Sequence, residues 1–164
     1  MQLPAHNHLD QLGLNYTKRA FPTTTDKGAA HVARALGFQP RQMVKTLIFE
    51  VDTGETVLVM VGGDQTAISG HLKKAIGSRN IKLAHPDVVR ETTGYVIGSV
   101  PPFHWQPPGF RSFVDAALLQ EDALGVGTGQ WGEEILMTPA DLVKASRAIV
   151  VNLTDKAKPV VPNA

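Results

Sequence analysis

Lys45 is the residue whose type and position first suggest chemistry. It stands in the apolar run 43–51, where strand alternation places it on one face with Met43 and Leu47. An ammonium group on such a face is costly to desolvate, so it must reach solvent, pair with a carboxylate or line a pocket that receives an anion. From its position in the strand alone, we expect the Lys45 ammonium group to reach solvent, because charged side chains are rarely buried. The anion-binding interpretation therefore requires a second feature elsewhere in the chain.

The segment 92–102 offers such a feature, because it combines glycine with two consecutive prolines. Gly98 permits a close backbone approach or an unusual dihedral angle. Pro101 and Pro102 stiffen the loop without adding donors. Free N–H groups of this loop could then point at a ligand oxygen. An ordinary Gly/Pro turn between two strands is the alternative interpretation, which composition alone favours.

Other catalytic signatures are missing from the sequence. It has no GxxxxGK[ST], GxSxG or HExxH motif and no cysteine, which removes the usual carriers of nucleotide hydrolysis, hydrolase-elbow and zincin chemistry. Gly125, Gly127 and Gly129 superficially resemble a dinucleotide-binding loop. Residues 130–134, however, predict a turn into another strand, so no helix N-terminus would receive a pyrophosphate.

The histidines give weak signals. His6 and His8 could hold a metal, but they lie near the N-terminus without a third ligand nearby, so we expect them in solvent. We expect a surface or helix-capping role for His85. His104 and Trp105 follow the proline pair and could stack on terminal bases of a nucleic acid, although aromatic side chains in a loop also serve packing.

Periodicity predicts the elements that must position these residues. Helices are expected at 25–36, 64–76, 87–93 and 139–146, and strands at 43–51, 56–61, 79–84, 95–97, 111–115, 124–128, 134–137 and 148–153. The first two strands are joined by the turn 52–55 and read as a hairpin. Hairpins mixed with helices predict a mixed sheet with helices around it, and not a doubly wound parallel fold.

Length and composition limit the classes of protein further. The chain of 164 residues, 43% of them hydrophobic, predicts a single domain spanning 1–164, with a core at about 3–154 and a short C-terminal tail. The net charge of +1 creates no global field for nucleic acid, although lysines and arginines between 73 and 90 could form a local phosphate-facing patch or a solvated face. Apolar runs are far shorter than a membrane span of roughly 20 residues, and no signal peptide is evident, so we expect a cytoplasmic protein.

Three features together carry a family resemblance. They are the run Met43-Val44-Lys45-Thr46-Leu47, the Thr93-Gly94-Tyr95 segment leading into GxxxP at 98–102, and the glycine-rich turn at 125–129. Their order resembles the YbaK/EbsC family of aminoacyl-tRNA deacylases, which is similar to the editing insertion domain of bacterial prolyl-tRNA synthetase. The resemblance implies an α/β fold with a mixed, curved, barrel-like β-sheet surrounded by helices.

The resemblance also implies which residues form the site. Lys45 matches the family's functional lysine and would neutralise a terminal phosphate or fix the ester. Gly98 belongs to the loop that would hold the ester carbonyl as it gains negative charge, while water, helped by a hydroxyl of the tRNA, attacks. Catalytic roles therefore fall on Lys45 and Gly98, with no metal and no cofactor. The substrate-binding residues are expected to be Thr46, Ser99, Val100, Pro102, Gly127, Thr128, Gly129 and Phe21.

The implied substrate is a mischarged tRNA, read at its 3′-terminal adenosine and acceptor stem, with prolyl-tRNA synthetase as a further partner. Cys-tRNA(Pro), Ala-tRNA(Pro) and similar small amino acids are expected. The editing insertion domain carries a pocket-sizing histidine in its last glycine-rich segment, where this chain has Gly127, Thr128 and Gly129, so the amino acid stays open. A non-catalytic tRNA- or nucleotide-binding module of the same fold is the alternative, and the oligomeric state is open too.

Overall fold

The computed structural model describes residues 1–160, so the last part of the expected tail, 161–164, lies outside the described residues. The helices are α1 (Pro4–Gln11), α2 (Ala29–Leu36), α3 (Ser69–Ile76), α4 (Pro86–Thr93) and α5 (Pro139–Ser146), with 3-10 turns η1 (Pro40–Gln42) and η2 (Ala116–Gln120). The strands are β1 (Thr17–Ala20), β2 (Val44–Val51), β3 (Thr56–Gly62), β4 (Ile81–Leu83), β5 (Ser112–Asp115), β6 (Leu124–Gly127), β7 (Glu133–Met137) and β8 (Ile149–Val151).

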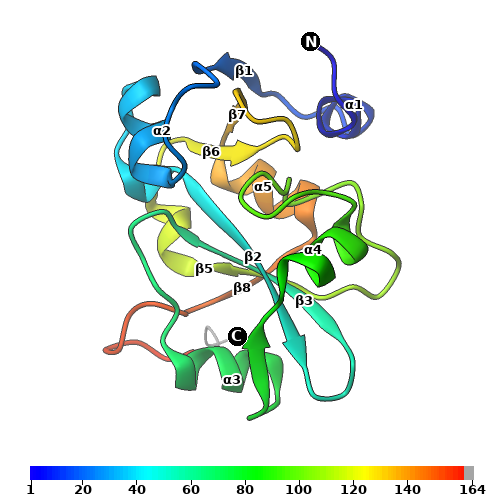
Figure 1. Ribbon diagram of the computed structural model, residues 1–164. Coiled ribbons are helices and arrows are strands. Elements are labelled where there is room, and N and C mark those ends of the chain that lie inside the picture. Colours follow the sequence, from blue (N-terminus) through cyan, green and yellow to red (C-terminus); the bar gives the residue numbers. More distant parts are fainter. Residues whose placement is uncertain (161–164) are drawn as a thin grey trace.

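The strands form two sheets with helices around them (Figure 1). One has the order β1-β7-β6 and is antiparallel, and the other has the order β4-β2-β3-β5-β8 and mixes antiparallel with parallel pairs. A single bridge between Met43 and Gly125 connects them. The predicted mixed α/β fold is confirmed, with its sheet divided into two parts.

The hairpin β2–β3 is confirmed, and it sets the position of Lys45. Its register pairs Lys45 with Val61 and Thr46 with Met60. The turn closes where the Val51 N–H donates to the Glu55 carbonyl and Gly54 takes a φ of 91°. A positive φ is easy for glycine, so the local sequence specifies this turn.

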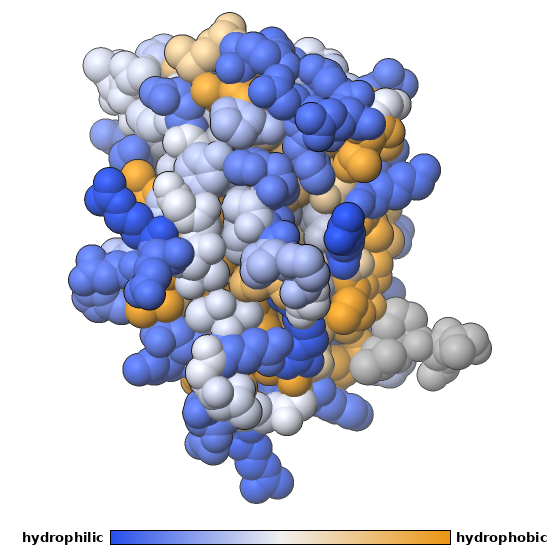
Figure 2. All heavy atoms as spheres, turned by 90° about the vertical axis from the view of Figure 1, so that its right-hand side faces the viewer, coloured by the Kyte–Doolittle hydropathy of each residue, from blue (hydrophilic) through white to orange (hydrophobic). Residues whose placement is uncertain are grey.

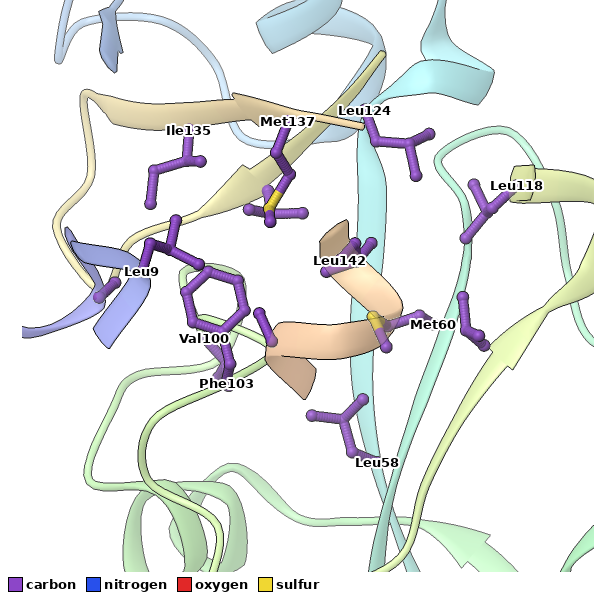
Figure 3. Close-up of a cluster of buried hydrophobic side chains, with 14 of the residues drawn as sticks. Leu9, Leu58, Met60, Val100, Phe103, Leu118, Leu124, Ile135, Met137 and Leu142 are labelled. Carbon is purple, nitrogen blue, oxygen red and sulfur yellow. The ribbon is translucent and has the colours of Figure 1, made fainter. Parts of the chain in front are cut away.

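The core lies on both faces of β3. Leu58 and Met60 pack into a cluster beneath α5 and the β6–β7 hairpin (Figure 3), while Val57, Val59 and Val61 pack with α3 on the other side. Successive side chains of a strand point to opposite faces, so a strand covered on both faces needs a continuous apolar run. The rigid centre of the protein therefore supports the strand that carries Lys45.

Some predicted elements differ from the structure. The segment 95–97 is not a strand: Gly94 ends α4 in the left-handed conformation, and the Ser99 N–H donates to the Val96 carbonyl, which bends the chain into a turn. α3 begins only at Ser69, because the Ile68 N–H donates to the Leu153 carbonyl and keeps the preceding residues extended. α1 and β1 were not predicted.

The expectation that His6 is solvated is wrong. α1 buries its side chain completely, its Nδ1 accepts a hydrogen bond from the Leu3 N–H, and its ring stacks on Tyr16. His8 reaches the Ala145 carbonyl through Nε2, at 3.1 Å. Across residues 1–160 no group of three or more histidine or acidic side chains could hold a metal ion.

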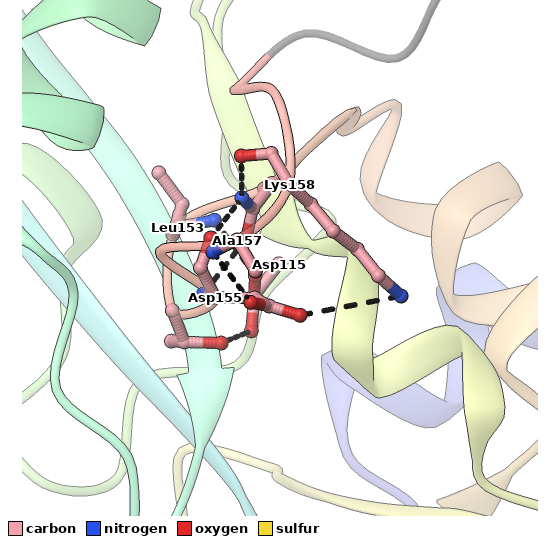
Figure 4. Close-up of polar contacts among 7 residues, drawn as sticks. Asp115, Leu153, Asp155, Ala157 and Lys158 are labelled. Atoms are coloured by element: carbon pink, nitrogen blue, oxygen red, sulfur yellow. Dashed lines mark hydrogen bonds and ion pairs between the residues drawn. The ribbon is translucent and has the colours of Figure 1, made fainter.

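The segment after β8 folds back onto the sheet (Figure 4). The Asp115 carboxylate accepts hydrogen bonds from the Leu153 N–H and the Thr154 hydroxyl, at 2.8 and 2.6 Å. The Asn152 N–H donates to the Val160 carbonyl, and the Val160 side chain is buried. Part of the expected tail, up to Val160, is thus packed against the body of the domain.

The face shown in Figure 2 is mostly hydrophilic, with apolar residues in scattered patches. In the described part of the chain, no helix has both the length and the apolar character that crossing a membrane requires.

Candidate active site

A cavity of about 230 Å³ lies where the start of α2, the beginning of β2, the 97–100 loop and the β6–β7 hairpin meet. Part of its wall is a free strand edge, because β4 pairs only with residues 49–51 of β2 and leaves residues 44–47 uncovered on that side. The lining residues are Lys27, Gly28, Ala29, Val32, Met43, Val44, Lys45, Thr46, Leu47, Ile97, Gly98, Val100, Gly127, Trp131 and Glu134.

Lys45 and Thr46 both line this cavity, although alternation places them on opposite faces of β2. The free edge explains why both residues line the cavity, since side chains from either face of a strand can border a cavity that lies at its edge. Lys45 Nζ donates to the Gln65 carbonyl at 2.5 Å. The Thr46 hydroxyl oxygen is buried and has no hydrogen-bond partner among the described residues.

The start of α2 adds positive potential to the same cavity. Gly28 and Ala29, at its N-terminus, are lining residues, and the first turn has neither a side-chain cap nor an acidic residue. The first N–H groups of a helix lack intrahelical acceptors and carry partial positive charge. Together with Lys27 and Lys45, they make the cavity suitable for an anionic group.

The GxxxP loop is fixed from both ends. The Pro101 and Pro102 carbonyls accept hydrogen bonds from the side chains of Trp105 and Gln106, at 2.6 and 2.8 Å. The Ser99 carbonyl accepts one from the Gly129 N–H at 2.8 Å. The loop is thus held in place before any ligand binds.

Two N–H groups of this loop are free to bind a ligand. The Ser99 N–H is used in the turn to Val96, whereas those of Gly98 and Val100 find no acceptor within residues 1–160. Gly98 has a φ of 92° and its surroundings are open. Both residues line the cavity, so their unpaired N–H groups are candidate donors for a bound anion or oxyanion.

The glycines of β6 and the following turn make room for this arrangement. A Cβ atom on Gly127 would lie 3.2 and 3.3 Å from the Ser99 and Val100 carbonyl oxygens. One on Gly129 would overlap the Tyr95 ring. The glycine-rich segment thus packs against the GxxxP loop.

Half of the predicted site residues line the cavity and half do not. Lys45, Thr46, Gly98, Val100 and Gly127 are in the lining. Ser99, Pro102, Thr128, Gly129 and Phe21 are not in the lining.

The residues outside the lining have structural contacts of their own. Phe21 packs edge-on against Trp131 at 4.9 Å, so it supports a wall that Trp131 itself forms. The Thr128 hydroxyl donates to the Glu133 carbonyl within the β6–β7 turn. His85 caps α4, as expected, by accepting from the Asp87 N–H.

His104 and Trp105 are held within the protein and do not project as free stacking surfaces. His104 Nε2 lies 2.6 Å from the Tyr95 hydroxyl, and burial lowers the pKa of its imidazole. Trp105 packs edge-on against Phe110. Trp105 thus holds the GxxxP loop through the Pro101 carbonyl, whereas His104 fixes the Tyr95 ring.

The sequence reasoning missed three polar or aromatic residues of the cavity. Lys27 lies with Nζ 3.6 Å from the centre of the Trp131 ring, a cation–π geometry. Lys27 and Trp131 are two of the missed residues, and Glu134 is the third. Glu134 is the carboxylate of the described lining and is 8% exposed. Glu134 follows Glu133 at the start of the strand, where an acidic residue is ordinary, so its sequence position gave no signal.

Burial raises the pKa of the Glu134 carboxyl from 4.5 to about 8. The folded protein therefore binds this proton more tightly than the unfolded chain does, and the stability gained from it is lost as pH rises from about 4.5 through 8.

We expect Glu134→Gln to match the wild type in thermal stability near pH 5 and to exceed it at pH 8 by about 5 °C. Glutamine is close in shape to the neutral acid, so only the cost of ionisation is removed. Melting curves of both proteins at pH 5, 6, 7 and 8 measure the effect. A difference in Tm that does not change with pH would show that the carboxyl titrates near its ordinary value.

The fold and the cavity define a class of protein. A lysine, a helix N-terminus and two free N–H groups surround a space whose lining contains no serine, cysteine or histidine. Such a site suits an anionic ester whose carbonyl oxygen gains negative charge during hydrolysis.

Known proteins support this class. The sequence profile of the aminoacyl-tRNA editing domain matches residues 25–145. Over 115 residues the chain is 29% identical to the multifunctional Ser/Thr-tRNA deacylase ProXp-y of Escherichia coli strain K12, an alignment covering 68% of each protein. Over 90 residues it is 36% identical to the proline–tRNA ligase of Maridesulfovibrio salexigens, covering 55% of this chain and 15% of the ligase.

Solved structures agree. The crystal structure of hypothetical protein APE2540 superposes with a TM-score of 0.83 at 28% identity, covering 93% of this chain and 99% of that one. A structure described as a candidate trans-editing enzyme for prolyl tRNA synthetase gives 0.81 at 27% identity, covering 94% and 99%. The chain therefore belongs to the aminoacyl-tRNA editing domain family, a family of deacylases, and the resemblance found in the sequence is confirmed.

Proposed function

We propose that this protein is a trans-editing deacylase that removes a small, wrongly attached amino acid from tRNA. The observation that carries the proposal is the meeting of Lys45 with the free Gly98 and Val100 N–H groups at one cavity. This arrangement supplies a cation for the nucleotide and donors for the ester, which are the two things that hydrolysis of an aminoacyl ester requires from the protein.

The proposed reaction is hydrolysis without a covalent intermediate. Lys45 binds the phosphate of the terminal adenosine, assisted by the N-terminus of α2. The Gly98 and Val100 N–H groups hold the carbonyl oxygen as water adds to the carbon. The ester C–O bond then breaks, the ribose oxygen takes a proton, and the free amino acid leaves.

The size of the cavity favours small amino acids. Its volume of about 230 Å³ is below the roughly 300–1,000 Å³ that drug-sized ligands occupy. Alanine and cysteine on tRNA(Pro) are the first candidates. Serine and threonine are further ones, because a relative is named a Ser/Thr-tRNA deacylase and because the buried Thr46 hydroxyl has no partner in the described part of the chain.

The partner of the proposed reaction is the acceptor end of tRNA, and prolyl-tRNA synthetase is a proposed source of the misacylated substrate. Lys73, Lys74 and Arg79 line a surface depression away from the cavity and could contact phosphates of the acceptor stem. A substrate of this kind is made during translation, so the proposal also places the protein in the cytoplasm.

A panel of tRNAs charged with alanine, cysteine, serine, threonine and proline tests the proposal. We expect one or a few of the non-cognate esters to be hydrolysed well above the spontaneous rate, and correctly charged Pro-tRNA(Pro) to survive. The readout is loss of the labelled ester over time. Binding of tRNA with no ester hydrolysed above background would replace the proposal with a non-catalytic binding module of the same fold.

A further inference from the structure

Glu134 lies in the cavity, and the proposed hydrolysis gives it no role. Its side chain is 8% exposed, and neither a hydrogen bond nor an ion pair engages its carboxylate anywhere in residues 1–160. The two lysines of the cavity are directed elsewhere: Lys45 to the Gln65 carbonyl and Lys27 to the Trp131 ring. Within residues 1–160, no cationic side chain is thus paired with this carboxylate.

A carboxylate in this state is unfavourable for the protein alone. Removing an acid from water without a donor or a counter-charge costs several kcal/mol, and the raised pKa of Glu134 expresses that cost. A ligand that brings a cation would offset the cost, because an opposite charge at close range favours the ionised acid.

Two glycines of the neighbouring strand β6 face this carboxylate. In the register of β6 and β7, Gly127 lies directly opposite Glu134, and Gly125 lies on the same face two residues away. The position of a Cβ on Gly125 would be only 3.2 Å from Glu134 Oε2. The same position would lie 2.6 and 2.7 Å from Cε and Sδ of Met43, so the Met43 thioether and the carboxylate share the room that Gly125 leaves, and Glu134 itself lines the cavity.

Gly127 also links the carboxylate to the GxxxP loop, since a Cβ there would touch the Ser99 and Val100 carbonyl oxygens. Glu134 therefore lies opposite a glycine that contacts the loop carrying the Gly98 and Val100 N–H groups. In an aminoacyl ester the α-ammonium group is attached to the carbon next to the carbonyl carbon. It is also the one cation present in every such substrate.

We propose that Glu134 binds the protonated α-amino group of the aminoacyl ester, so that the site selects esters with a free amino group over N-acylated esters such as peptidyl-tRNA. This inference rests on the proposed function, which supplies the ester. Glu134 has a specificity role here. The positive charge of the α-ammonium group exists in an aminoacyl-tRNA and is lost when the nitrogen is acylated, so only the aminoacyl ester can pair with the Glu134 carboxylate.

Pairs of matched ligands test the inference through binding and through turnover. For binding, the probes are adenosines carrying alanine on a stable 3′-amide, and the same amides carrying lactic acid, in which a hydroxyl replaces the ammonium. We expect Glu134→Gln to weaken binding of the alanyl probe by 10-fold or more and to change binding of the lactyl probe by less than 3-fold. Glu133→Gln, at the next residue and on the opposite face of β7, should change neither.

For turnover, alanyl-, lactyl- and N-acetylalanyl-tRNA are compared as substrates, with seryl-tRNA and its hydroxy-acid analogue added. We expect wild type to prefer the free amine and Glu134→Gln to lose that preference. An equal loss on amine and hydroxyl substrates would overturn the inference in favour of a general base or a structural role. If no ester is hydrolysed, the proposed function fails, and the binding experiment still decides whether Glu134 recognises the ammonium.

Discussion

Replacing Lys45 with alanine is expected to lower kcat/KM for the edited aminoacyl-tRNA by about 100-fold or more, because the variant loses the lysine of the cavity that β2 holds in place. The fold should be unaffected. The hydrogen bond from Nζ to the Gln65 carbonyl is the one polar contact of this side chain within residues 1–160, and it lies at the surface. Rates of ester loss measured at saturating and limiting tRNA separate the effect on binding from the effect on chemistry.

Two further variants identify the property of Lys45 that matters. Lys45→Met retains the unbranched apolar stem without the charge and should be as inactive as Lys45→Ala. Lys45→Arg retains the charge in a planar, longer group and should recover part of the activity. Lys144→Ala removes an exposed lysine of α5 that does not line the cavity, and it should leave the rate unchanged. Full activity in Lys45→Met would contradict the role assigned to this lysine.

The parts of the site that the sequence predicts are those specified by local pattern. Lys45 is identified because it breaks the alternation of a strong apolar strand, and Gly98 because glycine and proline mark a special loop. Alternation was misleading for Thr46, since an ideal strand directs it away from Lys45. The free edge of β2, which brings both to one cavity, depends on how far β4 extends along β2, and that is a tertiary property.

Glu134, Lys27 and Trp131 were missed because their environment forms only after folding. An acidic residue at the start of a strand is typical of a solvent-facing position, and nothing near Glu134 in sequence indicates that Gly125 and Gly127 lie opposite it. The same reason explains the strand β1, Thr17–Ala20. Its sequence is mostly polar, and it is a strand because it pairs with β7, more than a hundred residues away.

Replacing Gly129 with alanine is expected to destabilise the protein by about 3 kcal/mol, from two separate causes. Its φ of 93° lies in a region that residues with a Cβ rarely adopt, at a cost of about 1–2 kcal/mol. The added Cβ would also overlap the Tyr95 ring, whose hydroxyl is bonded to His104, so the ring cannot move freely. Chemical denaturation monitored by tryptophan fluorescence measures the loss.

Gly109→Ala separates these two causes. Gly109 has a similar φ of 82° in an exposed turn, but no atom lies within 4 Å of its Cβ position. We expect this variant to lose only about 1 kcal/mol. The loss of unfolding free energy in Gly129→Ala beyond that in Gly109→Ala then measures the cost of the contact with the Tyr95 ring. Because the Gly129 N–H also holds the Ser99 carbonyl, the folded fraction of Gly129→Ala should show a lower kcat, whereas Gly109→Ala should not. Equal stability losses in the two variants would show that the Tyr95 ring can give way, and that Gly129 does not fix the position of the GxxxP loop.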